Sequence, residues 1–352
     1  MSDEARPEIS VVVRSMARPS LRAALDSIAA QHDVTAEAVV VAACGAAHPA
    51  LPPACGAHAV RFVPGARPLT RPQAANAGIA AARGAWITFL DDDDVFAAGH
   101  LAGLLRGAEA APWAGVITSY ATGVFRDGHT ERFGQPFSLS QLYERNFIHL
   151  SCALFARAHV DAGCRFDESF DIMQDWDFML QLAQRAAFQF VPIATFLWNA
   201  DAGESGAAGG ANHDASKFAR YRDRMYAKWA PARDALVART RPLLEQAAEL
   251  ARIRRYAEAD AALRGVLSMS PNDPWALNLR AMLLRAQGHL DDARRMQSLA
   301  VAVRPHDGTM LYNLALLDRA ANDLEAARRH ARRSAALDPS LASARALAAE
   351  LG

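Results

Sequence analysis

The stretch WITFLDDDD, residues 86–94, decides the fold class of the first half of the chain. Its apolar start predicts a strand over residues 86–90 that is covered on both faces, because apolar residues do not alternate with polar ones. Four aspartates follow directly, although they repel one another and have poor strand propensity. Ligands of open α/β sheets bind beyond the carboxyl ends of strands, so a bound cation is the simplest cause of this acidic run. The alternative is a solvated turn in which Asp94 caps a helix that starts at about Ala97.

Short β-branched and aromatic runs alternate with Ala- and Leu-rich stretches on both sides of this segment, up to about residue 200. This rhythm is typical of parallel strands joined by helices and predicts an α/β layer fold. The expected strands cover residues 9–13, 39–41, 59–63 and 86–90, and the expected helices cover residues 21–30 and 73–82.

The second half of the chain has a period of 34 residues, which is the spacing of Pro271, Pro305 and Pro339. Three more columns keep the same step: Ala259, Ala293 and Ala327; Leu243, Leu277 and Leu311; and Tyr256, Leu290 and Leu324. A 34-residue period with a small residue where two helices cross resembles the tetratricopeptide repeat. We therefore expect an all-α repeat domain with three repeats over residues 240–339 and a capping helix over residues 341–351. Such repeats either bind a protein partner or only extend and stabilise the first domain.

The composition fits a folded, two-domain protein of 352 residues. Its 38 basic and 38 acidic residues balance, which argues against nucleic-acid or anionic-membrane binding driven by net charge. Lysine occurs only at Lys217 and Lys228, and we attribute the preference for arginine to genomic composition. The four cysteines lack the paired spacing of a zinc site, so reduced and mostly buried thiols are expected. An acidic N-terminus and the absence of a long apolar run predict a cytoplasmic protein without a transmembrane helix.

Several segments resemble, in order and spacing, the family-2 glycosyltransferases of the GT-A, Rossmann-like fold. They are ISVVV with the following Arg18-Pro19, LDSIAAQ at residues 25–31, NAGIA to Arg83-Gly84, and FLDDDD at residues 89–94. The resemblance covers roughly residues 8–205 and implies domains at residues 1–235 and 240–352. It implies an inverting enzyme that uses Mn²⁺ or Mg²⁺ to move a sugar from a nucleotide-sugar donor to an acceptor hydroxyl. The acceptor is a glycan, a lipid-linked glycan or a protein.

The same resemblance implies roles for individual residues. The family's Asp-x-Asp element falls on Asp91 and Asp93, with Asp93 the expected direct metal ligand. The catalytic base falls on Asp175, before an expected helix over residues 179–185, and Gln174 replaces the glutamate that precedes the base. Capping of that helix is the alternative role for Asp175 or Asp177. The implied donor-binding residues are Arg14, Ser15, Ala43, Asn76, Arg83, Asp91 and Asp92, and the implied metal ligands are Asp93, Asp91 and Asp201.

The region between Glu37 and Asp91 contains arginines but no acidic residue, which is compatible with a pyrophosphate site. Two departures from the family pattern leave alternatives open. The strand over residues 39–41 ends in AACG rather than in acidic residues, so the nucleotide base is not assigned. WNAD replaces the family's Tyr-Arg-x-His element, so either Asp201 or His213 completes the metal shell, in or beside a Gly/Ala-rich loop expected to cover the site. These departures motivate an alternative function, an eroded transferase-fold scaffold that binds proteins through its repeats.

Overall fold

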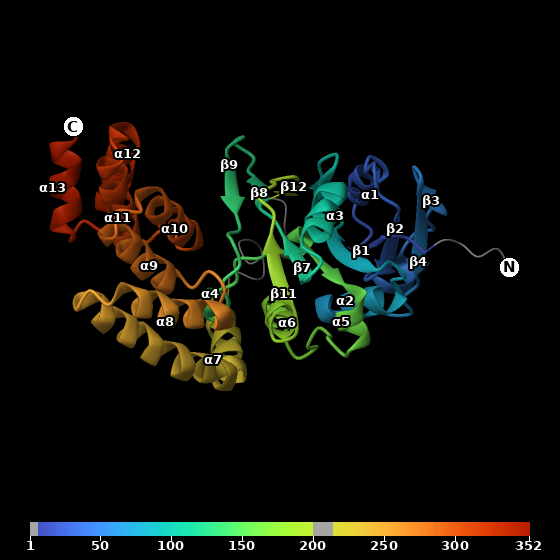
Figure 1. Cartoon of the computed structure of the whole chain (residues 1–352). Helices are drawn as coiled ribbons and strands as arrows, with labels where there is room; N and C mark the ends of the chain where they lie inside the picture. The colour runs from blue at the N-terminus through green and yellow to red at the C-terminus, as the bar shows by residue number, and fades with distance from the viewer. Residues whose placement is uncertain (1–5, 200–213) are drawn as a thin grey trace. The chain divides into compact units, whose positions relative to one another are not determined.

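The computed structural model describes residues 6–199 and 214–352 (Figure 1). The chain divides into two compact units. The first contains Met1–Gln135 and Asn146–Lys228, and the second contains Pro136–Arg145 and Trp229–Gly352. Each unit is described by itself below.

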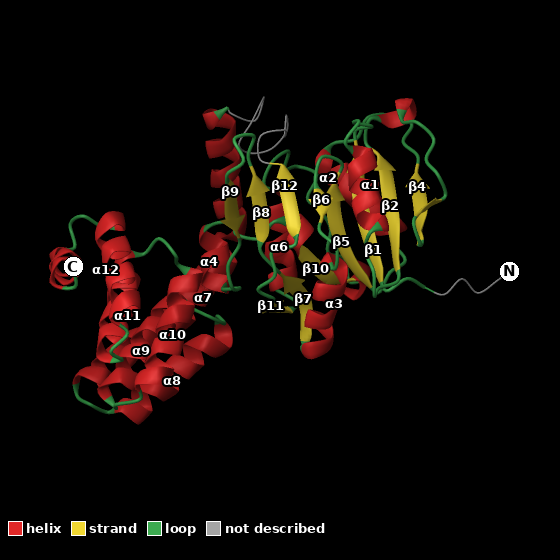
Figure 2. Ribbon diagram, turned by 90° about the horizontal axis from the view of Figure 1, so that it is seen from above, coloured by secondary structure: helices red, strands yellow, loops and turns green. Residues whose placement is uncertain are grey.

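The first unit is built on an eight-stranded sheet in the order β11-β7-β10-β5-β1-β2-β4-β3. Its central strands pair in parallel, β1 with both β2 and β5, and β2 with β4 (Figure 2). This confirms the α/β layer fold predicted from the alternation of apolar runs and helical stretches. The strands are β1 (Ile9–Ser15), β2 (Ala36–Ala42), β3 (Ala54–Cys55), β4 (His58–Val63), β5 (Trp86–Asp91), β7 (Ala114–Thr118), β10 (Ala153–Ala156) and β11 (Ala187–Phe190).

Helices cover both faces of this sheet. Neighbouring side chains of β1 point to opposite sides, and both sides carry apolar residues that have to be buried. Val11 and Val13 belong to one core cluster with Leu25 and Ile28 of α1. On the other face α2 approaches so closely that a Cβ on Gly78 would lie 2.2 Å from Cγ1 of Val12. The helices of this unit are α1 (Leu21–Ala29), α2 (Arg71–Ala81), α3 (His100–Ala110), α5 (Arg157–Asp161) and α6 (Gln174–Ala183), with short 3₁₀ turns η1 (Gly45–Ala47) and η2 (Leu150–Cys152).

A second sheet of four strands, in the order β6-β12-β8-β9, lies beyond the acidic run. Nothing in the sequence pattern indicated it, because its strands are short and include exposed charged residues. They are β6 (Val95–Phe96), β8 (Ala121–Val124), β9 (Thr130–Phe133) and β12 (Phe196–Asn199).

The second unit is all-α and keeps the 34-residue period. Helices α8, α10 and α12 begin 34 residues apart, as do α9, α11 and α13. The small residues Ala259, Ala293 and Ala327 are each fully buried, so the predicted helix crossings are confirmed. The helices are α4 (Leu139–Glu144), α7 (Ala215–Arg252), α8 (Tyr256–Met269), α9 (Pro274–Ala286), α10 (Leu290–Val303), α11 (Gly308–Ala320), α12 (Leu324–Leu337) and α13 (Ala342–Glu350), and α7 is shared with the first unit.

The segment 136–145 packs with the repeats although it interrupts the sequence of the first unit. Ser140 donates from Oγ to Asp273 at 2.8 Å, and Asn272 donates to the carbonyl of Phe137 at 2.8 Å. The period of the repeats could not reveal this insertion, because the segment lies about a hundred residues before them.

Two further expectations concern the whole chain. All four cysteines are free thiols and three of them are buried, as expected. No helix within residues 6–199 and 214–352 is both long and apolar enough to cross a membrane.

Candidate active site

Asp91 ends β5 directly opposite Arg14 of β1. Arg14 donates hydrogen bonds to both carboxylate oxygens of Asp91. Its Nη2 lies 2.6 Å from Oδ1 and 2.8 Å from Oδ2, and its Nε lies 2.9 Å from Oδ1. Burial acts to raise the pKa of Asp91, but the charge and hydrogen bonds of Arg14 outweigh it and hold that pKa below its usual range. Asp91 is therefore an oriented carboxylate that stays ionised.

Asp92 and Asp93 differ in how far their carboxylates are already satisfied. Asp92 is fully buried, and its oxygens accept from the backbone N–H of Met16 at 2.7 Å and from Arg18 Nη1 at 2.6 Å. Arg18 reaches Asp93 only at 3.3 Å. Burial and the neighbouring charge of Asp91 raise the pKa of Asp93, although Arg18 opposes them. The negative charge of Asp93 is thus less well compensated by neighbouring donors than that of Asp92.

Asp94 does not cap a helix, so that interpretation of the acidic run is wrong. Helix α3 begins at His100, and its N-cap is Gly99 in a left-handed conformation. The Asp94 carboxylate instead accepts from the backbone N–H of Asn199 at 3.0 Å and joins the end of β5 to β12. Burial, together with the charge of Asp91, raises the pKa of Asp94 to about 8.

Asp175 lies in the first turn of α6, which begins at Gln174 rather than at residue 179. Met173 occupies the N-cap position, so neither Asp175 nor Asp177 caps this helix. The amide Nδ2 of Asn146 donates to Asp175 Oδ2 at 3.1 Å. Helix α6 packs on the sheet through Phe178, whose ring lies edge-on to Phe155 of β10 with centroids 5.2 Å apart and stacks on Phe166 of the preceding loop at 4.2 Å.

The carboxylates of Asp91 and Asp175 belong to one polar neighbourhood. Burial lowers the pKa of His149, and the charges of Asp91 and Asp175 both oppose that shift. Burial and the charge of Arg14 lower the pKa of Arg71, and the same two carboxylates oppose it. The fold therefore gathers acidic groups from β5 and α6 around an imidazole and a guanidinium.

The other expected donor-binding residues are placed as follows. Ser15 and Ala43 lie at the carboxyl ends of β1 and β2, where the Ala43 N–H donates to the Ser15 carbonyl at 2.8 Å. The Ser15 hydroxyl already meets His48 Nε2 at 2.8 Å. Asn76 exchanges two hydrogen bonds of 2.9 Å with the backbone of Phe166, so it fixes the segment before Asp175.

The backbone of Arg83 lies at the opposite edge of the sheet from these residues. Its N–H donates to Ser10 and Glu37, which lie at the amino ends of β1 and β2. Asp201, His213 and the loop over residues 201–212 lie outside the described residues.

The donor atoms present suit a hard divalent cation. Carboxylate oxygens are the ligands that Mg²⁺ and Mn²⁺ prefer, and such ions take further ligands from substrate phosphates and water. Asp91 and Asp93 supply carboxylates at the carboxyl edge of the sheet. The pKa of Asp93 is raised by burial and then by the negative charge of Asp91, and a cation would offset both effects. Within the described ranges no three His, Cys, Asp or Glu side chains form a ready metal cluster. The residues fit a metal held jointly with a phosphate ligand.

The sequence assigned no role in this site to three residues. Arg18 neutralises the acidic run, Asn146 orients Asp175, and Lys228 binds the segment around Asp175. Each acts on residues at least 29 positions away in the chain, and only the folded sheet and helices bring them together.

Comparison with known proteins identifies the first unit. The sequence model described as Glycosyl transferase family 2 matches residues 10–166, which contain Arg14 and the whole acidic run. The chain contains a family-2 glycosyltransferase domain. The match ends before Asp175, so the expected base lies outside the part that the family model covers.

A curated relative of this chain is the succinoglycan biosynthesis protein ExoO of Rhizobium meliloti (strain 1021), 31% identical over 188 residues. That alignment covers 48% of this chain and 54% of ExoO, so the chain spans about half the length of the relative it matches. The comparison does not support the alternative of an eroded scaffold.

Two solved structures resemble parts of the chain. S. aureus TarS 1–349 is 14% identical, with 84% of this chain and 90% of that chain covered at a TM-score of 0.45. The Sgt2 TPR domain of Aspergillus fumigatus is 18% identical, with 32% of this chain and 76% of that chain covered at a TM-score of 0.31.

Proposed function

We propose that this chain is an inverting, metal-dependent glycosyltransferase that moves a sugar from a nucleotide-sugar donor to an acceptor hydroxyl. One observation carries the proposal: the acidic run at the carboxyl end of β5 shares its polar neighbourhood with a second carboxylate, Asp175, on another element. Two carboxylate groups with separate tasks are what such a transfer needs, one on the donor side and one at the acceptor.

The donor side is formed by the ends of β1 and β5. Asp93 is the proposed direct ligand of Mn²⁺ or Mg²⁺, with Asp91 beside it, while Asp92 is occupied in holding the loop after β1. When bound, the metal ion offsets the charge that builds on the departing nucleoside diphosphate. Arg14 and Arg71 add positive charge near the same edge of the sheet, which favours a pyrophosphate there.

Asp175 is the proposed general base. Its carboxylate accepts the proton of the acceptor hydroxyl while that oxygen attacks the anomeric carbon from the side opposite the leaving diphosphate. Attack from that side inverts the anomeric configuration. The Asn146 amide, 3.1 Å from Asp175 Oδ2, orients the carboxylate and leaves its other oxygen for the acceptor.

A saccharide is the proposed acceptor class. ExoO carries the name of a succinoglycan biosynthesis protein, and succinoglycan is a polysaccharide. The ring of His149 stacks on Trp198 with centroids 6.0 Å apart and planes inclined by 24°, and aromatic faces of this kind suit the apolar face of a sugar ring. The helical repeats are proposed to hold a protein partner or part of the acceptor.

The experiment that tests the proposal has two stages. Thermal shifts with a panel of nucleotide-sugars, with Mn²⁺ and with EDTA, should show one donor class that stabilises the protein only with metal. Transfer from that donor to a panel of oligosaccharides should then give a product of inverted configuration. If no nucleotide-sugar raises the melting temperature and none is consumed, the proposal is wrong.

A further inference from the structure

The only two lysines of the chain lie on one helix and pair with one segment. Lys228 of α7 places Nζ 2.8 Å from Asp167 Oδ2 and 2.7 Å from Asp177 Oδ1. Lys217, three turns earlier on the same helix, approaches Asp171 at 3.5 Å. The acidic partners all fall within residues 167–177, the segment that carries Asp175.

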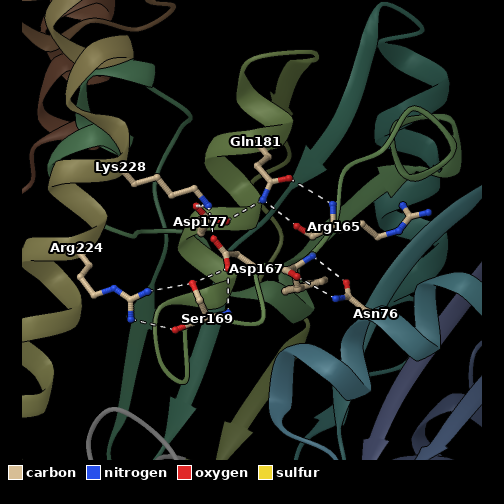
Figure 3. A network of polar contacts seen from close by, with 9 residues as sticks. Asn76, Arg165, Asp167, Ser169, Asp177, Gln181, Arg224 and Lys228 are labelled. Carbon is tan, nitrogen blue, oxygen red and sulfur yellow. Dashed lines mark hydrogen bonds and ion pairs between the residues drawn. The ribbon is translucent and has the colours of Figure 1, made fainter.

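Lys228 connects the two ends of this segment. Asp167 begins it, and Asp177 lies in the first turn of α6, two residues after Asp175. One ammonium group therefore holds the start of the segment to the turn that presents the base. Figure 3 shows Lys228 reaching from α7 to both carboxylates.

The rest of the network saturates these carboxylates. Asp177 is fully buried, and its other oxygen accepts from Gln181 Nε2 at 2.8 Å. Asp167 Oδ1 accepts from the N–H and the hydroxyl of Ser169 at 3.0 and 2.7 Å. Each carboxylate thus has one oxygen bonded to Ser169 or Gln181 and the other to Lys228, an arrangement that suits a compact cation with both oxygens 2.7–2.8 Å away. An ammonium is such a cation, whereas a guanidinium is a wide planar fork.

Two more contacts hold the segment, one from α7 and one from α2 (Figure 3). Arg224 of α7 donates to the carbonyl and the hydroxyl of Ser169 at 3.1 and 3.0 Å. Asn76 of α2 binds the backbone of Phe166. The segment before the base is thus held by α2, α6 and α7. Of the residues of α7 that bind it, Lys228 has the partner closest to Asp175 in sequence, which is Asp177.

We propose that Lys228 is a positioning residue for the catalytic base: by holding Asp167 to Asp177 it sets the place of Asp175 relative to the acceptor. This inference rests on the proposed role of Asp175. Lys228 acts only through the segment and takes no part in proton transfer. It also explains why lysine stands here in a chain that otherwise uses arginine.

The charges of this contact are stable near neutral pH. Burial acts to raise the pKa of Asp167, yet hydrogen bonds from Lys228 and Ser169 lower it to about 2. Burial acts to lower the pKa of Lys228, and its bonds to Asp167 and Asp177 raise it above the ordinary value. The ammonium of Lys228 and the carboxylate of Asp167 are therefore charged near neutral pH.

The test compares Lys228→Ala with Lys217→Ala, which removes the other lysine of the same helix. With the donor and acceptor found for the wild type, Lys228→Ala should lower kcat roughly 30- to 100-fold, because a small misplacement of a catalytic group costs about that much. The KM for the donor should stay within about threefold. Propylammonium in the buffer should restore part of kcat, and tetramethylammonium, which cannot donate a hydrogen bond, should not. Lys217→Ala should keep the wild-type kcat.

Amide hydrogen exchange without substrates gives a readout that does not depend on activity. In Lys228→Ala, exchange should accelerate over residues 165–177 while β1 and β5 stay protected. If Lys228→Ala does not fold, Lys228→Met combined with Asp177→Asn removes the buried charge imbalance and should show the same effects.

The outcomes separate the two proposals. A wild type that transfers no sugar contradicts the proposed function, while the exchange of residues 165–177 still decides whether Lys228 holds the segment. An active wild type with unchanged kcat in Lys228→Ala overturns the role of Lys228 and leaves the proposed function standing. Unchanged exchange over residues 165–177 overturns it as well.

Discussion

Arg14 and Asp91 form an ion pair across the parallel strands β1 and β5, with three N···O distances between 2.6 and 2.9 Å. The Arg14 side chain is only 12% exposed, and its Nη1 has no hydrogen-bond partner among the described residues. The pair fixes the first carboxylate of the acidic run before any ligand binds, and it leaves one buried donor at the edge where the donor phosphates are proposed to lie.

Replacing Arg14 with methionine should destabilise the protein, because Asp91, whose side chain is 33% exposed, would then be a partly buried carboxylate without its partner. We expect the free energy of unfolding to fall by about 2 kcal/mol, less than for a fully buried pair, as measured by urea denaturation. The double variant Arg14→Met with Asp91→Asn should recover at least a third of that loss, since no unpaired charge remains. Equal stability of the single and double variants would show that the unpaired charge of Asp91 is not the cause of the loss.

Asp93→Ala should abolish the metal dependence of nucleotide binding. By isothermal titration with Mn²⁺ present, the affinity for the cognate nucleoside diphosphate should fall at least about tenfold, and it should match that of the wild type in EDTA. Asp94→Asn is the matched control, because an amide oxygen can still accept from the N–H of Asn199, 3.0 Å away. A metal response of wild-type size in Asp93→Ala would assign the metal to other residues.

His100 should make the protein less stable in mild acid. It is fully buried beside Phe96, and burial lowers its pKa to about 4. The unfolded chain takes up this proton at about pH 6.5, and the folded protein only near pH 4, so stability is lost as the pH falls through that window. The loss due to His100 should be about 3 kcal/mol between pH 7 and pH 4.

The test for His100 is urea denaturation of wild type and His100→Asn across that pH range. The variant is expected to be less stable at pH 7, because the ring packing on Phe96 is lost. Its unfolding free energy should then fall less steeply on acidification, so the two curves converge toward pH 4. Parallel curves would exclude His100 as the source of the acid sensitivity.

Gly78 should be intolerant of any side chain. A methyl group at this position would lie 2.2 Å from Val12 Cγ1 and 3.3 Å from Val41 Cγ2, so α2 would have to move off the sheet. Gly78→Ala should lower the unfolding free energy by about 1–3 kcal/mol. Ala80→Ser, at an exposed position of the same helix, should change it by less than about 0.5 kcal/mol. Equal effects of the two substitutions would mean that α2 packs less closely than described.

The parallel core of the fold could be predicted because its strands are covered on both faces. The strand over residues 86–90 was expected within one residue of β5, and the period of 34 residues located the repeat helices. The four-stranded sheet could not be predicted, because strands as short as Val95–Phe96 carry no periodicity. The packing of residues 136–145 with the repeats depends on side-chain contacts such as Ser140 with Asp273, which leave no local pattern.

The part of the site made of adjacent residues could be predicted from the sequence. The part that depends on hydrogen-bond partners from distant segments could not. The repulsion between four adjacent aspartates can be recognised from the sequence alone. Their division of tasks is set by Arg14, Arg18 and the N–H of Asn199, which the fold brings from β1, the following loop and β12. The composition showed that lysine is rare in this chain. The reason for a lysine at position 228 became visible only with its two partners, the carboxylates of Asp167 and Asp177.

The most direct test of the account is the rate of sugar transfer by Asp175→Asn, measured with the nucleotide-sugar and acceptor identified for the wild type. Asparagine has the size and shape of aspartate, and its amide oxygen can still accept from Asn146 Nδ2. The matched control is Asp171→Asn, an exposed position of the same segment. We predict that Asp175→Asn lowers kcat about 10³-fold with an unchanged KM for the donor and an unchanged melting temperature, while Asp171→Asn keeps full activity. Transfer by Asp175→Asn at the wild-type rate would contradict the assignment of Asp175 as the base.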